Sequence, residues 1–123
     1  MDERTISTIS RVTLVVQNML AVTEFYRDVL QLKPIFDLDV QPPQWIEFNT
    51  GPCTIALQVA SRTDGVPSTY NKIVFYVENV VNARQELLDR GAPMSEIEDD
   101  GRFQYCEGQD PENNKFQISN RPA

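Results

Sequence analysis

The chain has 123 residues, of which 41% are hydrophobic and 24% charged, and it contains no histidine. Its formal net charge of −7 argues against nucleic acid or an anionic membrane surface as the main partner, because both bind basic faces. No apolar run approaches the ~18 residues that a membrane helix needs, and the N-terminus lacks the layout of a secretion signal, so we expect one cytoplasmic domain.

The absence of histidine limits the chemistry that the chain can perform. Histidine is the commonest ligand of transition metals and the commonest acid–base group at neutral pH. The two cysteines, Cys53 and Cys106, lie far apart and form no CxxC pair, so they predict neither a disulfide scaffold nor a zinc site. Any catalysis would therefore rest on carboxylates, lysine, tyrosine or cysteine.

The first predicted elements are a strand over residues 11–16 and a helix that begins after Asn18. Alternation along the strand turns its even-numbered residues towards the helix and its odd-numbered residues, Arg11 among them, to the opposite face. Asn18 suits the N-cap, because its side chain accepts a hydrogen bond from a free amide of the first turn. The apolar residues that predict the buried face of the helix are Val22, Phe25, Tyr26, Val29 and Leu30.

Pro34 ends this helix, and three strands are predicted after it, over residues 35–40, 45–49 and 54–60. In the last two strands alternation assigns four apolar side chains to the core. These are Ile46, Phe48, Ile55 and Leu57. The side chains left on the opposite face are Trp45, Glu47, Asn49, Thr54, Ala56 and Gln58.

The second half repeats this order after a polar stretch over residues 61–71, which we interpret as a linker inside one compact unit. A strand over residues 72–77 leads into a helix over residues 80–90 that Gly91 ends. Three further strands are predicted over residues 93–98, 103–107 and 115–119, with a turn at residues 99–101 and a loop at residues 108–114.

Two details of this half follow from local rules. Asn113 or Asn114 is expected to adopt a positive φ, which asparagine tolerates. Alternation places Phe116 and Ile118 in the core. The internal repeat, aligned on Phe48 and Ile46, places two more aromatic residues there: Phe103 and Tyr105.

The sequence therefore predicts an α+β fold of two βαβββ modules, which we call module one (residues 9–60) and module two (residues 72–121). The helices would cover the outer face of a curved mixed sheet and leave a concave cup on the other face. That open face must be filled by its own side chains, by a ligand or by another subunit.

Three features together resemble the vicinal oxygen chelate superfamily, which includes glyoxalase I, the bleomycin-resistance proteins and the extradiol dioxygenases. They are the duplicated module, the strand-to-helix junctions VVQNM and YVENV, and the loop GQDPENNKFQIS before the last strand. The resemblance extends from Ile9 to Arg121. It implies a homodimer with cups at or near the subunit interface.

In the metal-dependent members of this superfamily, the ligands lie on the first and last strands of each module. When these positions are transferred to the present chain, they correspond to Arg11, Ala56, Lys72 and Gln117. A protonated arginine or lysine cannot bind a metal, and alanine has no donor atom. We therefore expect no metal and no cofactor at the usual site of the family.

The cup face contains several candidate ligand-binding residues. Arg11 and Lys72 occupy equivalent places, and they form either an anion clamp or local ion pairs with groups such as Glu47. Alternation places Trp45 and Tyr76 there as walls for a flat ligand. The six candidate ligand-binding residues are Arg11, Trp45, Gln58, Lys72, Tyr76 and Gln117.

The favoured hypothesis is a metal-free small-molecule binding protein of the bleomycin-resistance kind, with an anionic or aromatic organic ligand in the cup. One alternative is a glyoxalase-like lyase or isomerase that acts through Glu47 as general base without the usual metal. For Glu47 a salt bridge competes with that role. The other alternative is a non-catalytic module whose cup is filled by its own side chains and which works through protein contacts.

Overall fold

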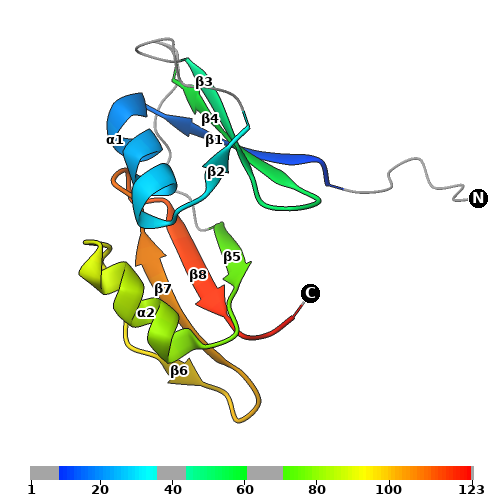
Figure 1. Ribbon diagram of the computed structural model, residues 1–123, viewed down its shortest axis with the longest axis vertical. Helices are drawn as coiled ribbons and strands as arrows, with labels where there is room; N and C mark the ends of the chain where they lie inside the picture. Colours follow the sequence, from blue (N-terminus) through cyan, green and yellow to red (C-terminus); the bar gives the residue numbers. More distant parts are fainter. Residues whose placement is uncertain (1–8, 36–43, 61–70, 123) are drawn as a thin grey trace, which may run out of the picture.

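The computed structural model describes residues 9–35, 44–60 and 71–122, and it confirms an α+β fold. Two four-stranded sheets of mixed direction follow one another along the chain. Each has a helical segment on one side, α1 beside the sheet of module one and α2 beside the sheet of module two (Figure 1). No helix within the described residues is long and apolar enough to cross a membrane.

The sheet of module one has the strand order β1-β4-β3-β2, with β1 parallel to β4 and the other pairs antiparallel. Its helix continues into a π-helical turn, η1. The elements are β1 (Arg11–Val16), α1 (Met19–Glu24), η1 (Phe25–Val29), β2 (Lys33–Pro34), β3 (Trp45–Asn49) and β4 (Thr54–Val59).

The sheet of module two repeats this arrangement in the order β5-β8-β7-β6, with β5 parallel to β8. The elements are β5 (Lys72–Tyr76), α2 (Val80–Asp89), β6 (Glu98–Asp99), β7 (Gln104–Gln109) and β8 (Lys115–Ser119). The identical strand order confirms the internal duplication.

Local sequence signals account for the ends of these elements. The Asn18 side chain accepts a hydrogen bond from the amide of Ala21 at 3.1 Å, which confirms it as the N-cap of α1. Gly91 follows α2 with a φ of 96°, and Asn113 has a φ of 67°, as expected for a turn asparagine.

Module one contains a short strand, β2, just before the strand expected over residues 35–40. It pairs with β3 directly after the helix, and the Ile35 amide donates to the Glu47 carbonyl at 2.9 Å. Residues 36–40 lie outside the described residues. The strand expected over residues 93–98 is reduced to a Met94–Gly108 bridge and β6, because the Ser95 side chain accepts the hydrogen bond of the Glu107 amide.

The prediction that Phe103 and Tyr105 lie in the core is wrong, and both are only partly buried. In β7 the buried residues are Cys106 and Gly108. A Cβ atom at Gly108 would lie 2.6 Å from both Met94 Sδ and the Phe116 ring, so any other residue would require these side chains to shift. The ladders make Cys106 the counterpart of Ile46 and Gly108 the counterpart of Phe48, so β7 is shifted by three residues from the predicted alignment, from 103 to 106 and from 105 to 108.

The two modules share one hydrophobic core. The η1 segment lies at their junction, where the Phe25 ring contacts Phe116 at a centroid distance of 6.0 Å. The Tyr26 hydroxyl donates to the buried Asp110 carboxylate at 3.0 Å, and the Glu112 carboxylate accepts from backbone amides just before α1. The core positions predicted by alternation are confirmed for Ile46, Phe48, Ile55, Leu57, Phe116 and Ile118.

Candidate functional site

Each sheet has a concave face, by which we mean the face opposite its helix. Large apolar side chains remain open on both concave faces instead of being covered. The exposed fractions are 39% for Val15 and 42% for Trp45 in module one, and 52% for Val74 and 56% for Tyr76 in module two. Both faces are therefore available to a ligand or to a second subunit.

A cluster around Glu47 occupies the concave face of module one. The carboxylate accepts hydrogen bonds from Thr54 Oγ1 at 2.7 Å, Arg11 Nε at 3.2 Å and Trp45 Nε1 at 3.3 Å. These hydrogen bonds, the one from Thr54 first, lower the pKa of Glu47 below its ordinary value. Glu47 is therefore a hydrogen-bonded carboxylate at neutral pH, and the ion pair that competed with the general-base role is present.

Arg11 is held from two sides in this cluster. Its Nε atom binds Glu47, and its guanidinium carbon lies 5.8 Å from the centroid of the Trp45 ring. The terminal nitrogens of Arg11 have no hydrogen-bond partner among the residues that the structure describes. The result is a guanidinium whose remaining donors, as far as the described residues go, have no partner beside an exposed indole.

The concave face of module two contains the equivalent group around Glu107. Lys72 forms an ion pair with Glu107, and Gln117 Nε2 approaches the same carboxylate oxygen at 3.5 Å. The hydrogen bond from Lys72 is the main cause that lowers the pKa of Glu107. Glu107 lies opposite Gln117 in the ladder, just as Glu47 lies opposite Ala56, so the two carboxylates occupy the same place in the duplicated sheets.

Sequence reasoning missed Glu107, because the wrong parity of β7 placed it on the core side. The sequence does contain a signal for Glu107. In both modules an aromatic residue precedes a glutamate by two positions, as Trp45-Ile46-Glu47 and Tyr105-Cys106-Glu107. The structure places both aromatic residues beside equivalent carboxylates on the concave faces.

The predicted ligand-binding residues fall into two groups rather than one. Arg11, Trp45 and Gln58 lie on module one, where Gln58 is the ladder partner of Trp45. Lys72, Tyr76 and Gln117 lie on module two. Within the described part of the chain, Arg11 and Lys72 each form an ion pair inside their own module.

The resemblance assigns the metal ligands of the superfamily to four positions of this chain. The side chains at these four positions do not suit a metal ion. Arg11 and Lys72 are cations engaged by carboxylates, and the fully buried Ala56 offers no donor atom. Gln117 alone has a side-chain oxygen. Across the described ranges, no three histidine, cysteine, aspartate or glutamate side chains gather in a way that could hold a metal ion.

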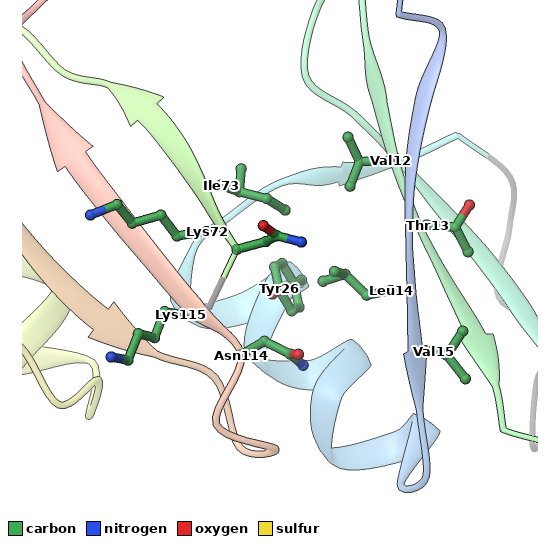
Figure 2. Close-up of a pocket in the computed structure, with 10 residues that line it drawn as sticks. Val12, Thr13, Leu14, Val15, Tyr26, Lys72, Ile73, Asn114 and Lys115 are labelled. Carbon is green, nitrogen blue, oxygen red and sulfur yellow. The ribbon is translucent and has the colours of Figure 1, made fainter. Parts of the chain in front are cut away.

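A cleft of about 460 Å³ lies between the edge strands β1 and β5, at the seam of the two modules (Figure 2). The figure shows Val12, Leu14, Ile73 and the Tyr26 ring projecting towards the gap. Of the predicted ligand-binding residues, Lys72 alone lines this cleft. The cleft is thus separate from the Glu47 cluster.

Comparison with known proteins gives one family and a common fold. The model of the "Glyoxalase/Bleomycin resistance protein/Dioxygenase superfamily" matches residues 8–118. Among curated proteins, no sequence matches the chain significantly.

Three solved structures illustrate the structural similarity. A lactoylglutathione lyase from Agrobacterium tumefaciens is 21% identical, with 93% of each chain covered and a TM-score of 0.73. An antibiotic binding protein from Streptomyces sp. CB03234 is 14% identical over 94% of this chain and 97% of its own, with a TM-score of 0.77. A fosfomycin resistance protein from Listeria monocytogenes is 19% identical over 94% and 93%, with a TM-score of 0.74.

Proposed function

The chain belongs to the glyoxalase/bleomycin resistance protein/dioxygenase superfamily, and we propose that it is a metal-free protein that binds a small organic molecule on the concave face of module one. The observation that carries this proposal is the guanidinium of Arg11, which Glu47 and Trp45 hold in place while its terminal donors meet no acceptor in the described part of the chain. A site that is already ordered loses little conformational freedom when a ligand binds.

The chemistry of this cluster favours a flat ligand with an anionic group. The terminal nitrogens of arginine form a planar fork that matches a carboxylate in a bidentate geometry. The exposed Trp45 ring beside it offers an apolar surface for stacking. Gln58, the ladder partner of Trp45, supplies an amide at the edge of the same surface.

We further propose that the protein acts as a cytoplasmic homodimer in which a second copy covers the concave faces. The four exposed apolar side chains on these faces are the support for this step, because apolar patches of this kind mark interaction surfaces. Such a dimer would bring Lys72, Tyr76 and Gln117 of module two over the ligand face of a neighbouring module one.

Catalysis through Glu47 fits the geometry less well than binding does. A general base at neutral pH needs a pKa near the working pH, whereas the hydrogen bonds to Glu47 lower its pKa. We therefore assign Glu47 the role of positioning Arg11. The lyase or isomerase function would require turnover that Glu47→Gln abolishes.

The test uses Trp45, the only tryptophan of the chain, as the reporter. Naphthoate and its neutral amide, naphthamide, are titrated while the tryptophan fluorescence and the melting temperature are followed. We expect naphthoate to bind roughly tenfold more tightly than naphthamide, because a hydrogen bond to a charged group contributes about 1.5–3 kcal/mol.

Two arginine variants separate the site from general charge effects. Arg11→Gln should remove the preference for naphthoate. Arg27→Gln makes the same change on the helical side of module one, where the arginine pairs only with Asp28 among the described residues, and it should leave the preference intact. Equal binding of both compounds by the wild type, or binding of neither, would contradict the proposed site; failure of a broader ligand screen as well would favour the module with a self-filled cup.

A further inference from the structure

The seam cleft between β1 and β5 is a feature that the concave-face site does not use. Within the ranges 9–35, 44–60 and 71–122, both strands are the edge strands of their sheets, so no described strand pairs with their outer backbone N–H and C=O groups along the gap. The cleft volume of about 460 Å³ lies within the ~300–1,000 Å³ typical of small-molecule sites. The cleft can therefore hold an organic molecule of ordinary size.

The lining of this cleft is mainly apolar, and Thr13, Asn71 and Asn114 add polar residues to it. Val12 and Leu14 come from β1, Ile73 comes from β5, and the Tyr26 ring comes from η1 (Figure 2). The Tyr26 hydroxyl is already bonded to Asp110, so Tyr26 offers mainly its ring surface. These four side chains favour an aromatic or aliphatic body in the gap.

The wall formed by module two carries two lysines, and the buried Asp110 carboxylate binds the lining residues Tyr26 and Asn114. Lys72 and Lys115 are direct ladder partners on the parallel strands β5 and β8, an arrangement in which like charges repel. Lys72 pairs with Glu107, whereas Lys115 forms no ion pair with any residue that the structure describes. Lys115 also acts on Glu107 through its charge, so two cations share one carboxylate at this place in a chain whose net charge is −7.

Figure 2 shows where this charge lies relative to the apolar side chains. The stems of Lys72 and Lys115 line the cleft, and their ammonium groups extend away from its middle along module two. A ligand that contacts both regions must place its apolar body in the gap and its anionic group towards the outer edge of the module-two wall.

From this arrangement we propose that the seam cleft is a second ligand site, which takes an organic anion with an apolar body. The body contacts Leu14, Ile73 and the Tyr26 ring, and the anionic group is bound through the charge of Lys115. The site stands apart from the Arg11 cluster and does not depend on it.

The experiment compares two probes that share one aromatic body. Anilinonaphthalene sulfonate carries an anionic group, and N-phenylnaphthylamine lacks it. Binding is followed by probe fluorescence, and the place of binding by NMR of the folded protein. We expect the sulfonate to bind more tightly than the neutral amine and to shift the methyl signals of Leu14 and Ile73 more than the indole N–H signal of Trp45.

Charge-reversal variants test the role of the lysine. Lys115→Glu should weaken sulfonate binding roughly tenfold, or about 1.4 kcal/mol, because the variant replaces an attraction by a repulsion. Binding of the neutral amine should stay nearly unchanged. Lys33→Glu makes the same change on β2, outside the cleft, and should have no effect.

Several results would overturn the proposal. Shifts confined to the Trp45 region would show that the probes bind at the concave face, which would leave the proposed function standing and remove the seam site. Equal affinity for both probes, unchanged by Lys115→Glu, would remove the anionic preference. Sedimentation could also show a dimer. If the Leu14 and Ile73 signals of that dimer respond to protein concentration but not to either probe, a second copy covers the cleft.

Discussion

Glu47 and Glu107 bind the cationic side chains of the two concave faces. Each occupies the same ladder position in its module and binds a cation from the opening strand, Arg11 in one case and Lys72 in the other. The two carboxylates thus neutralise the two cations at positions to which the resemblance assigns the family's metal ligands. The hydrogen bonds lower the pKa values of both carboxylates, so the stability of the protein in acid depends on these two groups.

This linkage gives a prediction for the pH dependence of stability. A carboxylate whose pKa is lower in the folded state stabilises the fold above the unfolded pKa of about 4.3, and that contribution is lost as the pH falls through the folded pKa. The double variant Glu47→Gln with Glu107→Gln should therefore lose less unfolding free energy than the wild type between about pH 5 and about pH 3. Urea unfolding across this range measures the difference.

The control for the pH series is Glu78→Gln. Glu78 is exposed, and no ion pair joins it to another described residue, so this variant changes the net charge without breaking a contact. A double variant with the same acid profile as the wild type would show that the ion pairs contribute nothing to acid stability.

Among the elements, β7 is where local pattern and tertiary packing disagree. When both faces of a strand contain apolar residues, alternation alone cannot decide which face enters the core. This is the case in β7, where Tyr105 and Cys106 are neighbours and point to opposite faces. The decision comes from Phe116 on the neighbouring strand, whose ring occupies the space that a side chain at position 108 would need. Gly108 is therefore a packing requirement of the β7–β8 pair.

Gly108→Ala tests that requirement. The new Cβ atom would lie 2.6 Å from the Phe116 ring and from Met94 Sδ, so we expect a loss of about 1–3 kcal/mol in unfolding free energy. Gln109→Ala, on the exposed next position of β7, is the matched control. Combining Gly108→Ala with Phe116→Leu should recover part of the loss; a stable Gly108→Ala variant would show that the neighbours move aside easily.

At the scale of the whole molecule, the contacts between the modules determine where the open surfaces lie. The loop after β7 binds α1 and η1 through Glu112 and Asp110, and the shared core extends through Phe25 and Phe116. Joined in this way, the modules leave their concave faces open and a cleft between the edges of β1 and β5. The described part of the chain consequently has two kinds of open surface, the concave faces and the seam cleft.

The donor set at the family's metal positions gives a prediction for the intact protein. Because Arg11, Ala56, Lys72 and Gln117 supply no anionic ligand, zinc, nickel, manganese and iron(II) should not raise the melting temperature, and chelator should not lower it. Elemental analysis of the purified protein is the companion measurement. A stoichiometric metal that raises the melting temperature would contradict the metal-free proposal and point to oxygen ligands elsewhere.

Local patterns in the sequence determined much of the fold. The switch from a period of two to a helical period, repeated twice, predicted both modules, the core side chains of β3, β4 and β8, and the cap residue Asn18. It also placed Arg11, Trp45 and Glu47 on one face. These features depend on residues close together in the chain, which is why one sequence suffices to predict them.

Other features were decided only by the tertiary structure. The parity of β7 depends on the Phe116 ring, the role of Glu107 depends on Lys72, and the seam cleft depends on how two edge strands from different modules approach one another. In each case the deciding contact joins segments far apart in the chain. Periodicity reports which side a residue faces relative to its neighbours, but the partner that it meets there is set by how the whole chain packs.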